Sequence, residues 1–181
     1  QYGIPLDIHG NVMYYNKDLL AKYGVEHFLD DNIVTVDEML QLAGKMDEGD
    51  YVVNNALFEW VTFGNLVALG GSLSDELGNP TLDSPEMRQV IQKLKELADN
   101  GLLTPYGEDG YAMFQAGNVL FSTDGTWTST AHDSIDGLDY GVTNVYSTSD
   151  GSKFYNRSSA HLFSILKNDE RSEEKVKGIA D

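Results

Sequence analysis

The apolar positions of this 181-residue chain change their period several times, and each change predicts a new element. Every second residue is apolar from Ile4 to Ile8, and an apolar run resumes at Val12. This alternation is typical of a strand, so residues 1–15 are predicted to be extended.

Signals for helix ends follow this extended segment. Asn16 can cap a short helix that Gly24 ends in the left-handed conformation. Thr35 and Glu38 form a capping box, in which each side chain accepts a hydrogen bond from the backbone N–H of the other residue. Residues 83–86 combine a polar cap, a proline at the first helical position and an acid near the positive end of the helix dipole. These signals place three helix starts.

The whole pattern mixes short strands with helices, which predicts an α/β fold with a single domain over residues 1–181. The expected helices span 17–23, about 35–46, 58–69, 83–100, 111–115 and 126–132, with a last one from about 172, and the expected strands span 51–55, 118–123, 138–145 and 160–166. Residues 146–153 are expected to form a polar loop.

Charge and composition exclude several classes of partner and site. There are 29 acidic and 12 basic residues, a formal net charge of −17. Such a field repels nucleic acids and anionic lipid, so no nucleic-acid partner is expected. The absence of cysteine excludes disulfides and thiolate metal sites. No apolar run approaches the roughly 20 residues that span a bilayer. The chain opens at Gln1 without a signal peptide and is expected to start inside a longer protein.

Several segments, taken in order, resemble one family. They are Tyr2–Leu6, Tyr14–Leu20, Thr35–Met39, Gly70–Gly71 with Leu82–Glu86, Ala112–Trp127, Asp139–Val142 and Ser164–Lys167. The most specific segment, 112–127, reads as a small/Phe helix, a glycine, an apolar strand and a glycine-x-tryptophan end. The match at 35–39 is partial, because Val36 stands where the family usually has tryptophan. In these segments the chain resembles the extracellular solute-binding proteins of sugar ABC importers, of which the maltose-binding protein is the best-known member.

The resemblance implies one lobe of a periplasmic-binding-protein-like fold whose two lobes close around a ligand. This chain would be mainly the second, C-terminal lobe, with hinge-crossing segments near 1–15 and 156–166 and with further segments outside it at both ends. The implied role is that of a monomeric carrier without cofactor, not an enzyme. It would capture a sugar or oligosaccharide and deliver it to the membrane subunits of an ABC permease. Its expected location is extracellular, either lipid-anchored at the cell surface or periplasmic.

Sugar sites combine aromatic faces, which stack on pyranose C–H groups, with polar groups that bind hydroxyls. Trp127 follows an Asp-Gly turn that can deliver its indole to the end of a strand, and by resemblance it is the family's stacking tryptophan. Packing inside the lobe is the alternative. Trp60 falls by resemblance at a ligand-contacting tyrosine, and a buried helix face is its alternative. Phe58 replaces a ligand-contacting acid, with Glu59 beside it.

His9 occupies an acidic ligand position of the family by resemblance, and a neutral imidazole can bind a sugar hydroxyl. A histidine of the hinge strand without contact to ligand is the alternative. Asn11 and Asp7 are its nearest polar companions. Three residues before the returning strand are further candidates for lining a cleft: Tyr155, Asn156 and Arg157.

Two other classes of function stay open from the residues alone. A carbohydrate-active enzyme such as a glycosidase, or its accessory sugar-binding module, is the first, and a protein-interaction domain is the second. The enzyme hypothesis predicts two carboxylates that converge on one pocket, with at least one shifted pKa. No metal site is expected, because no histidine pair has the spacing of helical metal ligands. The acidic stretches 47–50 and 75–83 do not match the EF-hand pattern either.

Overall fold

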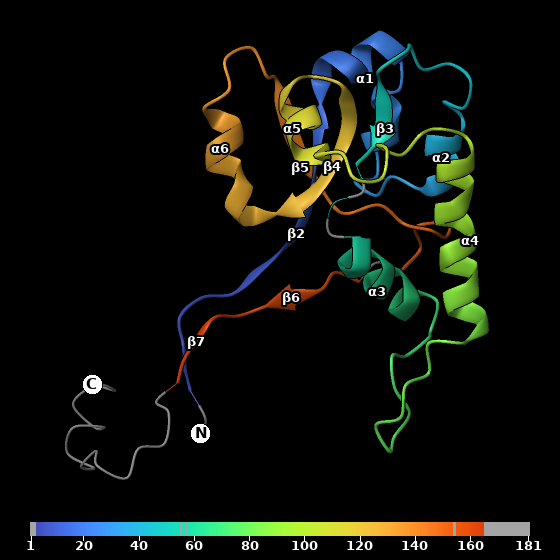
Figure 1. Ribbon diagram of the computed structural model, residues 1–181, viewed down its shortest axis with the longest axis vertical. Coiled ribbons are helices and arrows are strands. Elements are labelled where there is room, and N and C mark those ends of the chain that lie inside the picture. Colours follow the sequence, from blue (N-terminus) through green and yellow to red (C-terminus); the bar gives the residue numbers. More distant parts are fainter. Residues whose placement is uncertain (1–2, 55, 57, 154, 165–181) are drawn as a thin grey trace, which may run out of the picture.

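A computed structural model of the protein describes residues 3–54, 56, 58–153 and 155–164. The strands are β1 (Ile4–Pro5), β2 (His9–Asn16), β3 (Tyr51–Val53), β4 (Val119–Gly125), β5 (Tyr140–Thr143), β6 (Ser158–Ser159) and β7 (Leu162–Phe163). The helices are α1 (Lys17–Tyr23), α2 (Val36–Leu40), α3 (Phe58–Ala68), α4 (Pro85–Asp99), α5 (Gly110–Gln115) and α6 (Ser129–Asp133), with 3₁₀ helices η1 (Glu26–Leu29) and η2 (Thr126–Thr128). Figure 1 shows a body of sheet and helices from which two paired strands extend to one side.

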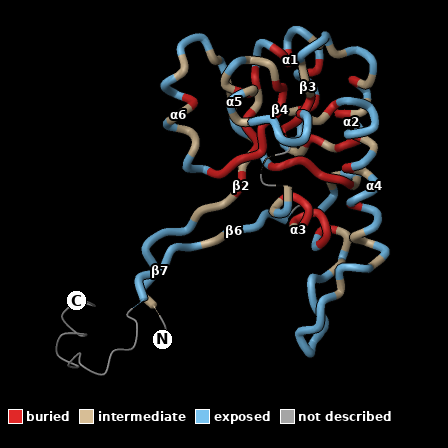
Figure 2. Tube along the Cα trace, in the orientation of Figure 1, coloured by how far each residue is buried: buried red, intermediate tan, exposed pale blue. Residues whose placement is uncertain are grey.

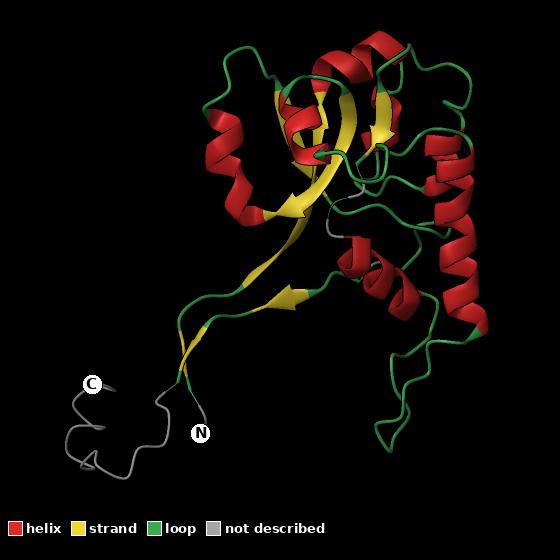
Figure 3. Cartoon of the chain, viewed as in Figure 1, coloured by secondary structure: helices red, strands yellow, loops and turns green. Residues whose placement is uncertain are grey.

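The central sheet is mixed, with strand order β3-β4-β2-β5, and β6 pairs with the start of β2. β2 is antiparallel to β4 and β5, whereas β3 runs parallel to β4. All seven residues of β4 are buried. A strand covered on both faces lacks the alternation of an exposed strand, which is why residues 119–123 read as a continuous apolar run with polar residues only at the end. The α/β fold class predicted from the sequence is confirmed, with helices packed around the sheet (Figure 3).

The larger of two hydrophobic clusters among the described residues joins the sheet to the helices, and its residues run from Met13 to Tyr146. Met13 and Phe121 of the central strands pack with Phe28 of η1 and with Leu94 and Leu97 on the apolar face of α4. Burying each large apolar side chain contributes about 1.5–3 kcal/mol before the cost in conformational entropy. In Figure 2 the buried residues gather in this body, and the paired strands outside it are largely exposed.

The predicted helix ends are present as hydrogen-bonded caps. Asn16 caps α1, Gly24 ends it with φ 67°, and Ser84 caps α4. The capping box is complete: the backbone N–H of Glu38 donates to Oγ1 of Thr35 over 3.2 Å, and the backbone N–H of Thr35 donates to Oε2 of Glu38 over 2.7 Å.

Two helix predictions differ from the structure. The helix expected over 35–46 is α-helical only to Leu40, and the following N–H groups bond three residues back, as from Leu42 to Met39 over 3.1 Å. The apolar spacing of residues 36–46 is compatible with both backbones, so the pattern overestimated the helix length. The helix expected over 126–132 is divided into η2 and α6.

The segment 146–153, expected as a polar loop, is buried where it begins. Tyr146 is 1% exposed. Asn65 of α3 donates to the backbone oxygen of Tyr146 over 3.2 Å and accepts the backbone N–H of Thr148 over 2.7 Å. A buried loop requires such partners for its backbone, and one amide side chain supplies them here.

The paired strands outside the body form the arm, defined as residues 4–10 and 158–163. Ile4 pairs with Phe163 and His9 pairs with Ser159, so residues 6–8 face only residues 160–161. The first strand therefore carries one residue more than its partner, as in a β-bulge. Of the strand expected over 160–166, only β7 (Leu162–Phe163) is a strand among the described residues, and β6 lies just before the expected range. Residues 165–166 and the helix expected from about 172 lie outside the described residues.

Candidate functional site

Three aromatic side chains predicted to contact ligand lie together where the arm joins the body. They are His9 of β2, Trp60 of α3 and Trp127 of η2, here called the aromatic cluster. The ring centroids of His9 and Trp127 are 5.3 Å apart, those of His9 and Trp60 are 6.3 Å apart, and those of the two tryptophans are 6.4 Å apart. Residues separated by up to 118 positions in sequence therefore form one surface.

Trp127 is the most accessible ring of the cluster, with 52% of the residue exposed. Its indole lies against Gly125 at the end of β4: a Cβ at position 125 would be 2.1 Å from atoms of the ring. Gly125 in turn pairs with Asn11 across β2 and β4. Glycine is needed here because any other side chain would displace the indole. The packing alternative for Trp127 does not hold, since half of the residue faces solvent.

Trp60 is more enclosed than Trp127. The guanidinium carbon of Arg157 lies 4.4 Å from the ring centroid of Trp60, and this cation–π contact covers one face of the indole. Glu59 is exposed on α3, and consecutive helix residues point about 100° apart, so Glu59 and Trp60 do not share a direction. The structure thus brings Trp60 into the cluster and leaves Glu59 beside it.

Asn11 of β2 pairs with Gly125, the residue against which the indole of Trp127 lies. It is 2% exposed, and neither its amide oxygen nor its amide nitrogen has a hydrogen-bond partner among the described residues. Buried polar atoms without partners are costly, so a ligand that supplied partners would be favoured. The amide of Asn156 donates to the backbone oxygen of Asn11. Tyr155 is half exposed, and its backbone passes over Gly64 of α3, where a Cβ would lie 2.4 Å from the oxygen of Tyr155.

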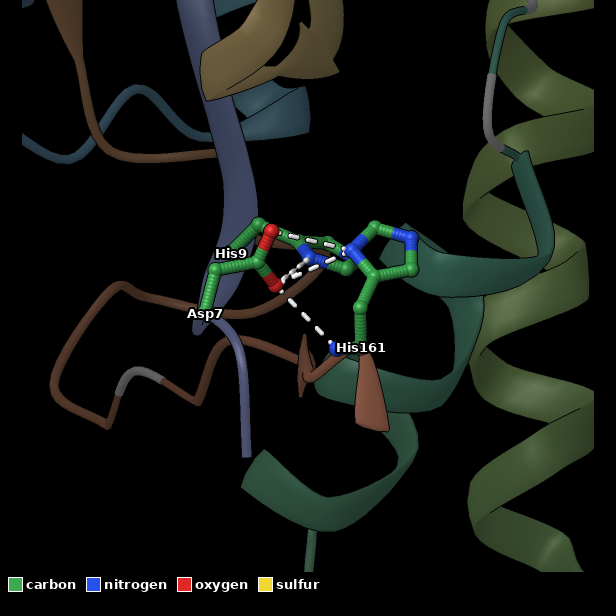
Figure 4. A group of neighbouring side chains, drawn as sticks. All are labelled: Asp7, His9 and His161. Carbon is green, nitrogen blue, oxygen red and sulfur yellow. Dashed lines mark hydrogen bonds and ion pairs between the residues drawn. The ribbon is translucent and has the colours of Figure 1, made fainter. Parts of the chain in front are cut away.

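A group of polar residues adjoins the cluster on the arm. One carboxylate oxygen of Asp7 lies 3.3 Å from Nδ1 of His9 and 3.0 Å from Nδ1 of His161 (Figure 4). The backbone N–H of His161 also donates to Asp7 over 3.1 Å. These bonds from His161, with a smaller contribution from His9, lower the pKa of Asp7 to about 2. His161 was missed in the sequence, because 154 residues separate it from Asp7 and no local pattern marks it.

The buried carboxylate of β4 does not join this surface. Burial raises the pKa of Asp124, and a hydrogen bond from the N–H of Gly125 to its carboxylate opposes that shift. Asp124 pairs with Val12, so it lies on the opposite sheet face from Asn11 and Gly125, because successive strand residues alternate between faces. A pair of carboxylates converging on the aromatic cluster, which the enzyme hypothesis predicts, is not formed by Asp124.

A cavity of about 790 Å³ lies elsewhere in the body. It is lined by Phe58, Ala98, Leu103, Thr104, Pro105, Tyr106, Gly107 and Glu108. None of the three rings of the aromatic cluster contributes to it. The aromatic cluster is therefore separate from this cavity. Among the described residues no helix is both long and apolar enough to cross a membrane.

The helix-covered sheet and its arm have the fold of one lobe of a two-lobed periplasmic-binding-protein-like structure. The family model described as bacterial extracellular solute-binding protein matches residues 1–171. The chain therefore belongs to this family, whose members are binding proteins and not enzymes.

Two curated relatives agree with this assignment. The arabinooligosaccharide-binding protein of Halalkalibacterium halodurans is 30% identical over 130 residues, which cover 65% of this chain and 28% of the relative. A probable ABC transporter-binding protein of Deinococcus radiodurans is 30% identical over 135 residues, which cover 65% of this chain and 31% of the relative. The chain thus spans about a third of the length of these relatives.

Solved structures share the fold. An ABC substrate-binding protein from Listeria monocytogenes in complex with cycloalternan superimposes with a TM-score of 0.75 at 20% identity, covering 99% of this chain and 46% of that one. A T. maritima protein with bound maltose superimposes with a TM-score of 0.68 at 22% identity, covering 98% of this chain and 48% of that one. Coverage of about half of each two-lobed structure agrees with the expectation of a single lobe.

Proposed function

We propose that this chain is mainly the second, C-terminal lobe of the carbohydrate-binding component of an ABC importer, and that this lobe contacts the ligand. Its ligand would be a sugar or oligosaccharide that bridges two lobes and stabilises their closed state. The arm would be the hinge crossing, because both of its strands leave the body at the same place and run side by side (Figure 1). The proposal of a single domain over 1–181, with hinge segments near 1–15 and 156–166, is supported by the larger hydrophobic cluster, whose residues run from Met13 to Tyr146.

The observation that carries the proposal is the half-exposed indole of Trp127 in the aromatic cluster. An aromatic ring with one accessible face is suited to stack on the apolar C–H face of a pyranose. Trp127 has the exposed area for this role, whereas Arg157 covers one face of Trp60. We therefore assign stacking on the sugar mainly to Trp127. The rings of Trp60 and His9 lie beside the Trp127 ring and would support its position.

Polar contacts would come from the groups around the rings. The amide of Asn11 is buried and has no partner among the described residues, so it would donate to and accept from sugar hydroxyls only after the side chains that cover it moved. His9 could donate to or accept from such hydroxyls as a neutral imidazole. Tyr155, Asn156 and Glu59 are exposed at the edge of this surface and would contact only a ligand longer than one sugar unit. The names of the relatives, which include an arabinooligosaccharide-binding protein, support an oligosaccharide.

The partners and location follow from this role. The closed, liganded form would be recognised by the membrane subunits of an ABC permease, and the carrier would act as a monomer. The family is extracellular. We propose either a lipid anchor at the cell surface or a periplasmic location, which detergent phase partitioning of the native protein distinguishes, since only a lipid-anchored protein enters the detergent phase.

The proposal is tested by a thermal-shift screen of the full-length protein against mono- and oligosaccharides, followed by calorimetry with the best ligand. A ligand that binds only the native state stabilises it by about 2.7 kcal/mol at a hundredfold excess over Kd. Trp127→Ala is expected to weaken binding by about 1–3 kcal/mol, roughly 5- to 150-fold, since a large stacked side chain is lost.

Tyr106→Ala is the matched control, because Tyr106 is a fully exposed aromatic residue on the distant cavity. It should leave affinity unchanged. Equal affinity of Trp127→Ala and the wild type would remove Trp127 from the site. Turnover of the sugar would favour the enzyme hypothesis, and stabilisation by peptides but by no sugar would contradict a carbohydrate ligand.

A further inference from the structure

The arm brings together a set of side chains that the binding of sugar does not require. Asp7 lies between β1 and β2, two positions before His9 at the start of β2, and His161 lies between β6 and β7 on the other segment of the arm (Figure 4). One ligand atom from each of the three lies within 4.8 Å of the other two. The ring centroids of the two histidines are 4.6 Å apart. We propose that Asp7, His9 and His161 bind one divalent transition-metal ion, with Zn²⁺ as the reference, and that the ion joins the two strands of the arm.

The type of ligand supports such an ion. Two imidazoles and one carboxylate are ligands of zinc and of neighbouring transition metals, whereas Ca²⁺ and Mg²⁺ prefer oxygen ligands alone. Three protein ligands leave a fourth position of a tetrahedral ion for water or another small ligand. The net charge of −17 also favours the approach of cations over anions.

The two distances from the carboxylate of Asp7 are close to those of a tetrahedral site, and all three ligand atoms lie within 4.8 Å of one another. With bonds of about 2.0–2.1 Å from the ion, neighbouring ligand atoms of a tetrahedral site are about 3.4 Å apart. The carboxylate of Asp7 lies 3.3 Å from Nδ1 of His9 and 3.0 Å from Nδ1 of His161. The side chains of Asp7 and His161 are 46% and 67% exposed, so an ion can enter from solvent.

The irregular register of the arm accounts for this convergence. Asp7 lies in the segment between β1 and β2 that carries the extra residue, two positions before His9. The extra residue in segment 6–8 interrupts the regular ladder, and the backbone N–H of His161 donates to the carboxylate of Asp7 instead. Bulges commonly redirect a side chain in this manner.

The spacing of histidines in the sequence does not predict this site, because its ligands lie in two segments of the arm that are distant in sequence. The inference is independent of the sugar proposal, although His9 belongs to both groups: a metal ion could bind the arm of a protein that carries any solute.

The test is isothermal titration of Zn²⁺ into chelator-treated, metal-free full-length protein and its variants. We expect one ion per chain to bind, and His161→Ala and Asp7→Asn each to weaken that binding at least tenfold, because each removes one of three ligands. The matched control is His27→Ala, since His27 is an exposed histidine of η1 outside this group. It should bind Zn²⁺ as the wild type does. No Zn²⁺ binding, or an equal loss in His27→Ala and His161→Ala, would overturn the proposal.

A second readout reports the position of the ion. The ring centroids of both tryptophans of the chain lie within 6.3 Å of that of His9, so a bound Ni²⁺ ion should quench their fluorescence. We expect quenching that saturates at one ion per chain and is lost in both His161→Ala and Asp7→Asn, whose circular dichroism should match the wild type. Saturable quenching that persists in both variants would place the ion elsewhere and refute the site.

Discussion

Asn65 connects the helix that carries Trp60 to the segment that leads to the arm, and its replacement tests this connection. The amide donates to the backbone oxygen of Tyr146 over 3.2 Å and accepts the backbone N–H and the hydroxyl of Thr148 over 2.7 and 3.1 Å. Asn65 and Thr148 are both buried. Asn65→Ala would therefore remove three bonds between segments that are distant in sequence.

The expected loss of stability follows from these bonds. A net hydrogen bond contributes about 1 kcal/mol, and a buried N–H left without a partner costs about 1–3 kcal/mol. Since the bonds share one partner residue and are not independent, we expect Asn65→Ala to lower the free energy of unfolding by about 3 kcal/mol. With an m value of about 2 kcal/mol/M in urea, the midpoint of unfolding should fall by about 1.5 M.

Urea unfolding followed by circular dichroism measures this change. The matched control is Asn100→Ala, because Asn100 is exposed and its amide makes a single hydrogen bond of 2.8 Å, to the backbone oxygen of Glu96. The control should lose less than about 1 kcal/mol. If Asn65→Ala destabilised the protein no more than Asn100→Ala, the connection between α3 and residues 146–148 would not stabilise the body as the structure indicates.

Two further predictions concern the site and the dependence on pH. Gly125→Ala should displace the indole of Trp127 into solvent, weakening sugar binding at least tenfold in calorimetry while the urea midpoint changes little, since the ring is half exposed; a large stability loss with normal affinity would contradict this. Burial acts to raise the pKa of Asp50, but hydrogen bonds from Lys22 and Tyr23 outweigh it and lower the pKa. Because the folded pKa lies below the unfolded one, this stabilisation is present above about pH 4 and is lost as the pH falls through the folded value. The difference in urea midpoint between wild type and Asp50→Asn should therefore shrink between pH 7 and pH 3, and an unchanged difference would refute the assignment.

The helix ends and the fold class could be predicted from local sequence because their causes are local. Asn16, Thr35 and Ser84 act on backbone groups two or three residues away, so their hydrogen bonds are readable in sequence. The limit of this reasoning is visible at Leu40, where the α-helix ends although the apolar spacing continues. Spacing reports which residues are buried, not which hydrogen-bond pattern the backbone follows.

Only part of the candidate site can be predicted from local sequence. Trp127, Trp60 and His9 were selected by residue type and by resemblance to a family, and the structure places their rings together. Their roles as ligand contacts remain proposals. The sequence predicts an Asp-Gly turn at residues 124–125, but both residues belong to β4. The close contact between Gly125 and the indole of Trp127 could not be inferred from the sequence, because it depends on how the ring folds back over the glycine.

The sequence alone determined the class of the protein, the helix caps and the identity of the aromatic residues, because each depends on residue types over short distances. Only the tertiary structure decided which polar groups meet. His161 reaches Asp7 because two strands from opposite ends of the described chain pair with one residue out of step. The segment at Tyr146 can be buried because the side-chain amide of Asn65, on α3, forms hydrogen bonds with the backbone groups of Tyr146 and Thr148. Contacts of this kind depend on the register and packing of distant segments, and no local pattern encodes them.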